Sequence, residues 1–291
     1  MLDIDKYKDE NNIFKKMWDK KENIDLLPKF YNNIIEVDFE EFKEKVYENN
    51  LRFANETVDS LLSGDIYILK NAFTNEYIDK IKKQTILNWK NIKSEFHKIY
   101  DGCPNFYRDI DTSLSNKYAF KQIKKTQYFF PWNQDYLNLY EEIYKRWRVL
   151  KYLSGYYEDV WETNTPKDGI IDRIQIVKYP PNSGSQELHQ DPYIYQKFFI
   201  SVYLSKKGKH FQDGGVYLVD TNNKKFSLED KVNVGDLSFG FGTIYHGVDI
   251  PIPIINTEND EYMGRWWLGI YSTESDYNKN KHTGNPVSLS Q

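Results

Sequence analysis

Three residues with metal-binding side chains lie in the second half of the sequence. The segment QELHQDPYIY contains His189 and Asp191 two positions apart, and the segment GDLSFGFGTIYHGV carries His246. Side chains at positions i and i+2 of a strand point to the same face, so His189 and Asp191 can converge on one ion. Two imidazoles and one carboxylate on one face of an octahedron leave three positions open, as in non-heme Fe(II) oxygenases. Taken alone, the His189/Asp191 pair is also compatible with a surface histidine and a turn aspartate.

A strand near the end of the chain adds a buried cation. In GRWWLGIYS, strand alternation places Arg265, Trp267, Gly269 and Tyr271 on one face. An arginine inside a barrel needs an anion, because burying an uncompensated charge costs several kcal/mol. Its planar fork matches a carboxylate bidentately. We therefore expect Arg265 to bind the carboxylate of a ligand.

The order of these motifs resembles that of the Fe(II)/2-oxoglutarate-dependent oxygenases, closest to their prolyl-hydroxylase-like and phytanoyl-CoA-hydroxylase-like branches. The resemblance rests on His189-x-Asp191, DGGVYLVD, GDLSFGFGTIYHGV and RWWLGIYS, and it covers residues 170–273. The segment GDIYILKNAFTNEYIDKIK is similar to the strand and helix that open such domains. The resemblance implies a double-stranded β-helix with Fe(II) on His189, Asp191 and His246, and with 2-oxoglutarate and O2 as co-substrates. It also implies that Arg265 pairs with the distal carboxylate of 2-oxoglutarate.

Two tyrosines extend the set that the resemblance implies. Tyr179 stands where prolyl-hydroxylase-like enzymes carry a tyrosine that reaches the co-substrate, and Tyr203 where a second tyrosine hydrogen-bonds its distal carboxylate. Many members have a serine two residues after the arginine, and here that residue is Trp267. Related halogenases lack the carboxylate ligand, so Asp191 favours oxygen transfer. An ordinary structural role for Tyr203 remains the alternative.

The substrate is less well indicated. The alternation that turns Tyr179 inward also turns Gln175 and Arg173 inward, so Arg173 can hold a carboxylate or phosphate, or instead form a structural salt bridge. We also expect Tyr193 and Trp132 to line the pocket. These residues favour hydroxylation of an unactivated C–H in a small polar metabolite such as an amino acid, with release of succinate and CO2. A peptidyl or protein side chain is the second candidate.

Two other classes of protein remain as alternatives. A cupin-like isomerase or epimerase, with a non-redox metal on a similar barrel, explains the histidines and the aspartate but leaves Arg265 and Tyr203 without a ligand. A silent scaffold has no use for three polar groups that converge inside a barrel. Turnover of 2-oxoglutarate separates the oxygenase from both alternatives.

The elements that must position these residues fall into two parts of one predicted domain, residues 1–291. Residues 1–165 read as mainly helical, with an N-cap at Asp38, a short strand at 66–69, a helix capped by Thr74, and a longer helix from Tyr136 to a stop at Gly155. From residue 170 to 273 the apolar period changes to two, which predicts an all-β core of jelly-roll type buttressed by the helices. Residues 274–291 read as a loose C-terminal tail. The 249–263 segment is an inserted loop that either covers the pocket or lengthens a hairpin.

Composition excludes several partners. The chain has 39 basic and 43 acidic residues, a net charge of -4, and lacks the basic excess expected of a nucleic-acid-binding protein. Cys103 is the only cysteine, which gives no disulfide framework and makes a cytoplasmic location the default. No apolar run is long enough to cross a bilayer. We expect a small-molecule substrate and no membrane, nucleic acid or obligate protein partner.

Overall fold

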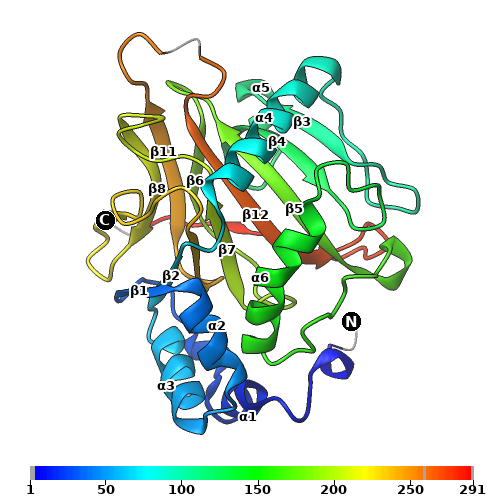
Figure 1. Ribbon diagram of the computed structural model, residues 1–291, viewed down its shortest axis with the longest axis vertical. Coiled ribbons are helices and arrows are strands. Elements are labelled where there is room, and N and C mark those ends of the chain that lie inside the picture. Colours follow the sequence, from blue (N-terminus) through cyan, green and yellow to red (C-terminus); the bar gives the residue numbers. More distant parts are fainter. Residues whose placement is uncertain (1–3, 258–259, 290–291) are drawn as a thin grey trace.

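The computed structural model describes residues 4–257 and 260–289. Its helices and strands alternate in the first half of the chain, and strands dominate the second half (Figure 1). The α-helices of the described residues are α1 (Ile13–Lys21), α2 (Phe39–Tyr47), α3 (Leu51–Leu62), α4 (Asn75–Asn91), α5 (Thr112–Ser115) and α6 (Leu139–Leu153). The strands are β1 (Ile34–Asp38), β2 (Ile66–Lys70), β3 (Phe106–Ile110), β4 (Gln122–Phe129), β5 (Ile170–Tyr179), β6 (Ser185–Gln190), β7 (Phe198–Tyr203), β8 (Asp213–Val219), β9 (Lys225–Ser227), β10 (Leu237–Phe241), β11 (His246–Ile252), β12 (Arg265–Glu274) and β13 (Asn285–Pro286).

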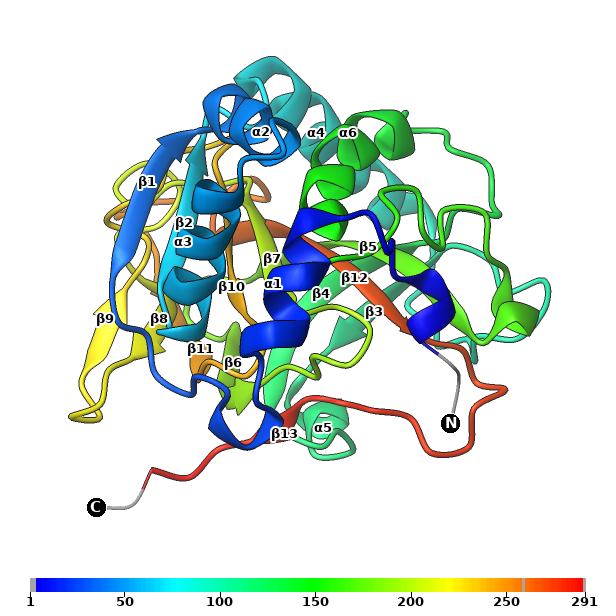
Figure 2. The same ribbon diagram turned by 90° about the horizontal axis from the view of Figure 1, so that it is seen from below.

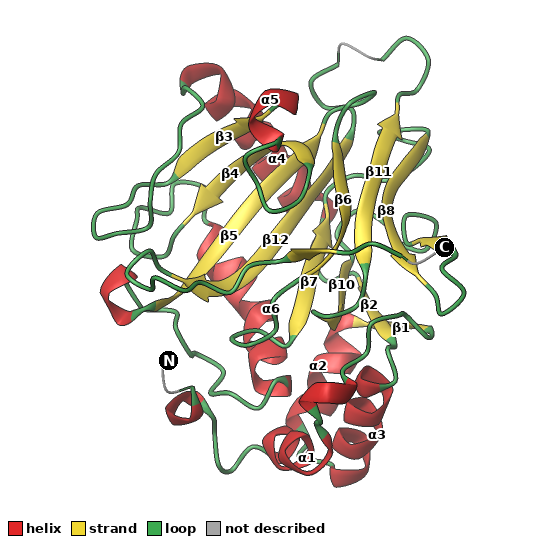
Figure 3. Ribbon diagram, turned by 180° about the vertical axis from the view of Figure 1, so that it is seen from behind, coloured by secondary structure: helices red, strands yellow, loops and turns green. Residues whose placement is uncertain are grey.

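The strands form one continuous hydrogen-bonded sheet that folds back on itself. Its order is β1-β2-β10-β7-β12-β5-β4-β6-β11-β8-β9, with β3 paired to β4 and β13 paired to β6. The pairs are antiparallel except β1 with β2. Strand β4 joins the two layers, because it pairs with β5 along most of its length and with β6 at its start. Figure 3 shows the strands of the two layers running side by side, as expected of a double-stranded β-helix.

Helices cover the outer face of the larger layer. Figure 2 shows α1, α2, α3 and α6 together on one side of the strands. The contact is aromatic: the ring of Trp18 in α1 lies 6.2 Å from that of Phe198 and 6.0 Å from that of Phe241, centroid to centroid. Trp147 of α6 is almost completely buried in the same core. The helices and the larger layer therefore share one hydrophobic core, in agreement with the predicted buttressing.

The helix boundaries follow the capping residues of the sequence. The Asp38 side chain accepts a hydrogen bond from the backbone N–H of Glu40 and begins α2, and Thr74 accepts from Tyr77 and begins α4. Helix α6 ends at Leu153, and Gly155 has a φ of 89°, a conformation that favours glycine. The predicted strand at 66–69 corresponds to β2. Tyr136, however, precedes α6, since that helix starts at Leu139.

Two parts of the sequence prediction were wrong. Residues 1–165 are not mainly helical after α4, because β3 and β4 lie there and β4 occupies a central place in the sheet. The end of the chain is not a loose tail either. Asn285 and Pro286 pair with Gln190 and His189 of β6.

The 249–263 segment extends β11 and then turns away from the sheet. Its residues up to Ile252 belong to β11, and Glu261 forms an ion pair with Lys90 of α4, 2.8 Å long. The carbonyl of Glu261 also accepts a hydrogen bond from Lys178. The described residues of this loop thus contact α4 and β5. The loop connects two layers rather than lengthening a hairpin, because β11 pairs with β6 and β8 whereas β12 pairs with β5 and β7.

Candidate metal centre

His189, Asp191 and His246 meet where β6 and β11 pair. His189 is near the end of β6, Asp191 follows that strand, and His246 begins β11 directly opposite His189. Nε2 of His189 lies 3.6 Å from one carboxylate oxygen of Asp191, and Nε2 of His246 lies 3.8 Å from the other. Their ligand atoms all lie within 4.8 Å of one another. The three side chains predicted from the sequence therefore converge on one point.

Backbone carbonyls fix the tautomer of both histidines. Nδ1 of His189 lies 2.8 Å from the carbonyl oxygen of Glu187, and Nδ1 of His246 lies 2.8 Å from that of Ile244. A carbonyl only accepts, so each Nδ1 carries the proton and each Nε2 presents a lone pair toward Asp191. Such a partner behind the ligand nitrogen is the usual arrangement of metal-binding histidines.

The carboxylate of Asp191 is incompletely satisfied by the described residues, although His246, Lys124 and Arg173 attract its charge. One of its carboxylate oxygens, Oδ2, is buried without a hydrogen bond in the described part of the chain. Burial raises the pKa of Asp191 and lowers that of His189 well below its usual range; repulsion from His246 is the second cause for His189. A divalent cation removes the cost of burying this carboxylate, and the nitrogen and oxygen donors suit iron. The residues present fit the expected metal.

Arg265 is buried at the start of β12, as predicted, but its anionic partner is a glutamate of the same chain rather than a ligand. Its Nε donates a hydrogen bond to Oε1 of Glu229 across 2.5 Å. Each of the two residues is only 2 % exposed. Gly215 makes room for Glu229: a Cβ at Gly215 would lie 2.6 Å from Cγ of Glu229. The inference from burial alone therefore fails, because Arg265 does not depend on a ligand for its anion. The hydrogen bond to Glu229 uses Nε, so the two terminal nitrogens of the guanidinium can still donate to another acceptor.

Three aromatic rings surround the guanidinium of Arg265. Its central carbon lies 5.5 Å from the ring centroid of Tyr179 and 5.9 Å from those of Tyr203 and Trp267. Tyr179 is opposite Arg265 in the register of β5 and β12, and Tyr203 is opposite Trp267 in that of β7 and β12. Burial raises the pKa of both tyrosines, so they stay neutral. The residues predicted to hold a co-substrate thus form one cluster, although the structure does not test that role.

A hydrogen-bonded amide connects this cluster to the metal centre. The hydroxyl of Tyr179 donates to Oε1 of Gln186, and the Nε2 amide of Gln186 lies 3.0 Å from Nε2 of His189. Lys124 donates to the same Oε1 atom across 3.3 Å. Since Nε2 of His189 carries a lone pair, the amide donates to it. In this arrangement Gln186 contacts the nitrogen that a metal would bind.

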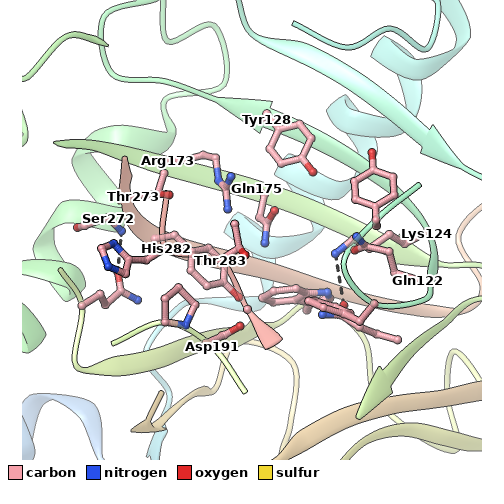
Figure 4. A pocket seen from close by; sticks show the side chains of 18 of the residues that line it. Gln122, Lys124, Tyr128, Arg173, Gln175, Asp191, Ser272, Thr273, His282 and Thr283 are labelled. Carbon is pink, nitrogen blue, oxygen red and sulfur yellow. Dashed lines mark hydrogen bonds between the residues drawn. The ribbon is translucent and has the colours of Figure 1, made fainter. Parts of the chain in front are cut away.

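A cavity of about 250 Å³ opens onto the metal centre at Asp191. Figure 4 shows Arg173 and Gln175 pointing into it from β5 with Asp191 across from them. Polar and aromatic side chains make up most of its wall. The lining residues are Tyr118, Phe120, Gln122, Lys124, Tyr128, Arg173, Gln175, Gln186, Asp191, Pro192, Gln196, Phe198, Trp267, Tyr271, Ser272, Thr273, His282, Thr283 and Gly284.

Two of the four predicted substrate residues line this cavity. Arg173 and Gln175 do, as strand alternation predicted. Trp132 does not: its ring stacks on Phe130 and its indole N–H donates to the carbonyl of Cys103, in a separate small cluster. Tyr193 packs against the core and faces an adjoining hollow. Strand β6 ends at Gln190, so the alternation that would have pointed Tyr193 inward does not continue.

Several residues of the site were missed by the sequence analysis. Lys124 and Gln122 come from β4, which was not predicted, because its sequence QIKKTQYF has four consecutive polar residues and no apolar alternation. His282 fits no ligand spacing in the sequence, yet it lines the cavity and its Nδ1 lies 3.2 Å from Glu274. No local pattern marks this segment, because only the pairing of β13 with β6 brings it there.

Comparison with known proteins supports the fold. The sequence matches no family model and no curated protein. The C-terminally truncated thymine-7-hydroxylase of Neurospora crassa, in apo form, superposes with a TM-score of 0.50 at 14% identity, over 86% of this chain and 96% of that one. The full-length form of that enzyme with alpha-KG and thymine gives 0.46 at 15% identity over 86% and 87%, and a Pseudomonas putida prolyl-4-hydroxylase gives 0.45 at 11% identity over 75% and 96%. The chain has the fold of the truncated enzyme, and the predicted double-stranded β-helix is confirmed.

The described helices also bear on a membrane location. None of them combines the length and the apolar composition that crossing a bilayer requires.

Proposed function

We propose that the chain is an Fe(II)/2-oxoglutarate-dependent dioxygenase that hydroxylates an unactivated C–H of a small polar metabolite such as an amino acid. Succinate and CO2 are the co-products. The observation that carries this proposal is the convergence of His189, Asp191 and His246, with one buried Asp191 oxygen left without a partner. When bound there, iron supplies the activation of O2 that attack on such a bond requires.

The chain's own residues supply binding, orientation and exclusion of water. With its Nε held by Glu229, Arg265 presents a terminal pair of N–H groups of the right spacing for the distal carboxylate of 2-oxoglutarate. Tyr203 and Tyr179 stand beside that guanidinium and can donate to the same molecule. Trp267 and Phe198 contribute apolar walls to the cavity in front of the metal centre. A reacting carbon held there is kept from bulk water.

The cavity favours a small and polar substrate. Its volume of about 250 Å³ and its amide, hydroxyl and cationic side chains suit a metabolite of amino-acid size. Arg173 and Gln175 are the proposed substrate contacts. The acidic net charge and the single cysteine support a cytoplasmic enzyme that acts without nucleic acid.

A non-redox, cupin-like metalloenzyme is the second candidate, and one observation favours it. Glu229 balances the charge of Arg265, so the chain can keep Arg265 buried without any co-substrate. An isomerase or epimerase would need only the metal centre and the cavity. The two candidates differ in whether 2-oxoglutarate binds and is consumed.

The deciding experiment measures succinate formation from 2-oxoglutarate by Fe(II)-loaded protein exposed to O2, with and without a panel of amino acids. We expect wild-type protein to form succinate faster with one member of the panel, and His189→Ala to form none. His97→Ala, a histidine outside the site, is the matched control and should behave as wild type. If no succinate forms and calorimetry detects no 2-oxoglutarate binding to the metal-loaded protein, the oxygenase proposal fails and the cupin-like candidate replaces it.

A further inference from the structure

Two basic side chains line the cavity, and neither forms an ion pair at contact distance within the described residues; the carboxylate of Asp191 attracts both from farther away. Lys124 of β4 is 6% exposed, and the acceptor of its ammonium group is the neutral amide oxygen of Gln186. Nε of Arg173 in β5 is buried and has no hydrogen-bond partner among residues 4–257 and 260–289. The guanidinium carbon of Arg173 lies 5.4 Å from the ring centroid of Tyr128 and 5.5 Å from that of Tyr271. These rings hold the guanidinium but do not neutralise it.

Three other buried cations of the described residues have a carboxylate partner. Lys151 lies 2.6 Å from Asp172, and Lys197 lies 2.6 Å from Glu22. Arg265 has Glu229. Lys82 lacks a carboxylate as well, but it packs over the ring of Trp266 and lines no part of the cavity. Lys124 and Arg173 therefore stand out because they share one cavity, and burying two like charges there is costly unless an anion joins them.

The rest of the lining supports an anion. Among the described lining residues, Asp191 is the only carboxylate, and its charge belongs to the metal centre. The amides of Gln122 and Gln175 add N–H donors to the same wall. The cavity thus has the metal ligand Asp191 and, away from it, the basic side chains Arg173 and Lys124 (Figure 4). Burial, followed by repulsion from Arg173, lowers the pKa of Lys124 to about 7.

We propose that Lys124 and Arg173 form an anion site for the primary substrate, which is a small acid bound through its carboxylate or phosphate with its reacting carbon toward the metal centre. This site is separate from the one at Arg265. The identity of the bound molecule as a substrate rests on the function proposed above, whereas the anion site itself does not. Neutral substrates of the same size are rejected, because they leave both cations unpaired.

Binding of inorganic phosphate to the metal-free protein tests the site directly. Calorimetry should show saturable binding to wild type, weakened at least about tenfold in Lys124→Met and in Arg173→Gln, because each loses a charge-assisted hydrogen bond. Lys43→Met and Arg52→Gln, both on the outer helices, are matched controls and should bind as wild type. The proposal is overturned if wild type does not bind phosphate, if both cavity variants bind it normally, or if only Arg265→Gln loses it.

A second experiment tests the substrate class. Succinate formation is measured with pairs of compounds that differ only in charge, such as an amino acid and its carboxamide. We expect stimulation by the acid and not by the amide, and a KM for the acid that rises at least about tenfold in Arg173→Gln but not in Arg52→Gln. Equal stimulation by the amide would refute the acid substrate. If phosphate binds as predicted but no compound yields succinate, the oxygenase proposal fails and the anion site stands.

Discussion

Nε of Arg265 donates a hydrogen bond to Oε1 of Glu229 inside the sheet, where both side chains are almost completely buried. The same Glu229 oxygen accepts from the backbone N–H of Val216, 2.9 Å away. Its second oxygen is buried without a hydrogen-bond partner in the described residues. Glu229 therefore holds Arg265 in one orientation, and Arg265 in turn balances its charge.

The Arg265–Glu229 pair should behave as a coupled unit. Removing one partner leaves an uncompensated buried charge, so Glu229→Gln and Arg265→Gln should each lower the free energy of unfolding by about 3–5 kcal/mol. The double variant should lose clearly less than the sum of the two. Urea denaturation of the four proteins measures this coupling, and losses that simply add would show that the two charges are independent.

Gln186 should compete with the metal for His189. Its amide lies 3.0 Å from the nitrogen that the metal needs, so Gln186→Ala should tighten Fe(II) or Mn(II) binding by about two- to tenfold, the value of one net hydrogen bond. Calorimetry under anaerobic conditions provides the measurement. Gln122→Ala is the control, because Gln122 pairs with Gln186 between β4 and β6 and also lines the cavity. Weaker metal binding in Gln186→Ala would mean that the amide supports the site.

Asp191 should lower the stability of the metal-free protein. Its buried, unpartnered oxygen and its raised pKa both indicate an unfavourable charge. Asp191→Asn should therefore raise the Tm of the protein measured in chelator. It should also abolish the rise in Tm that Mn(II) gives to wild type, where binding at a hundredfold excess over Kd adds about 2.7 kcal/mol to the free energy of unfolding. Asp249→Asn, an exposed position on β11, should change neither value. A lower Tm in chelator would show that Asp191 is a structural residue.

The metal ligands could be predicted from the sequence because their positions follow local rules. The i, i+2 spacing correctly predicted that His189 and Asp191 converge, although β6 ends at Gln190 between them. Strand alternation places Gln175 and Arg173 on the cavity wall. The division of the chain into helical and β-rich parts could also be predicted from local signals. These are the capping residues, such as Thr74, and the change in the spacing of apolar residues from the helical to the strand period.

The residues that could not be predicted are brought to the site by pairing between distant segments. Glu229 reaches Arg265 from 36 positions away, and no pattern in the sequence relates the two. The pairing of Asn285 with Gln190 likewise brings the end of the chain to the cavity. Lys124 is a different case, because its strand has neither apolar alternation nor the apolar run that marks a buried strand.

His210 should make stability depend on pH between about 4 and 6.5. Burial, followed by repulsion from Lys82 and Lys209, lowers the pKa of His210 to about 4. Its Nδ1 accepts a hydrogen bond from the backbone N–H of Lys206, which requires the neutral ring. Below the usual pKa of about 6.5 the unfolded chain takes up a proton that the folded protein refuses, so stability falls as the pH drops toward 4.

The measurement compares wild type with His210→Gln by urea denaturation in chelator at several pH values. Wild type should lose on the order of 1 kcal/mol more than His210→Gln between pH 6.5 and 4, a value reduced for solvent screening because the ring is only partly buried. His97→Gln controls for the loss of a histidine elsewhere and should follow wild type. Parallel pH profiles for wild type and His210→Gln would show that His210 titrates normally, and that the turn between β7 and β8 opens to water.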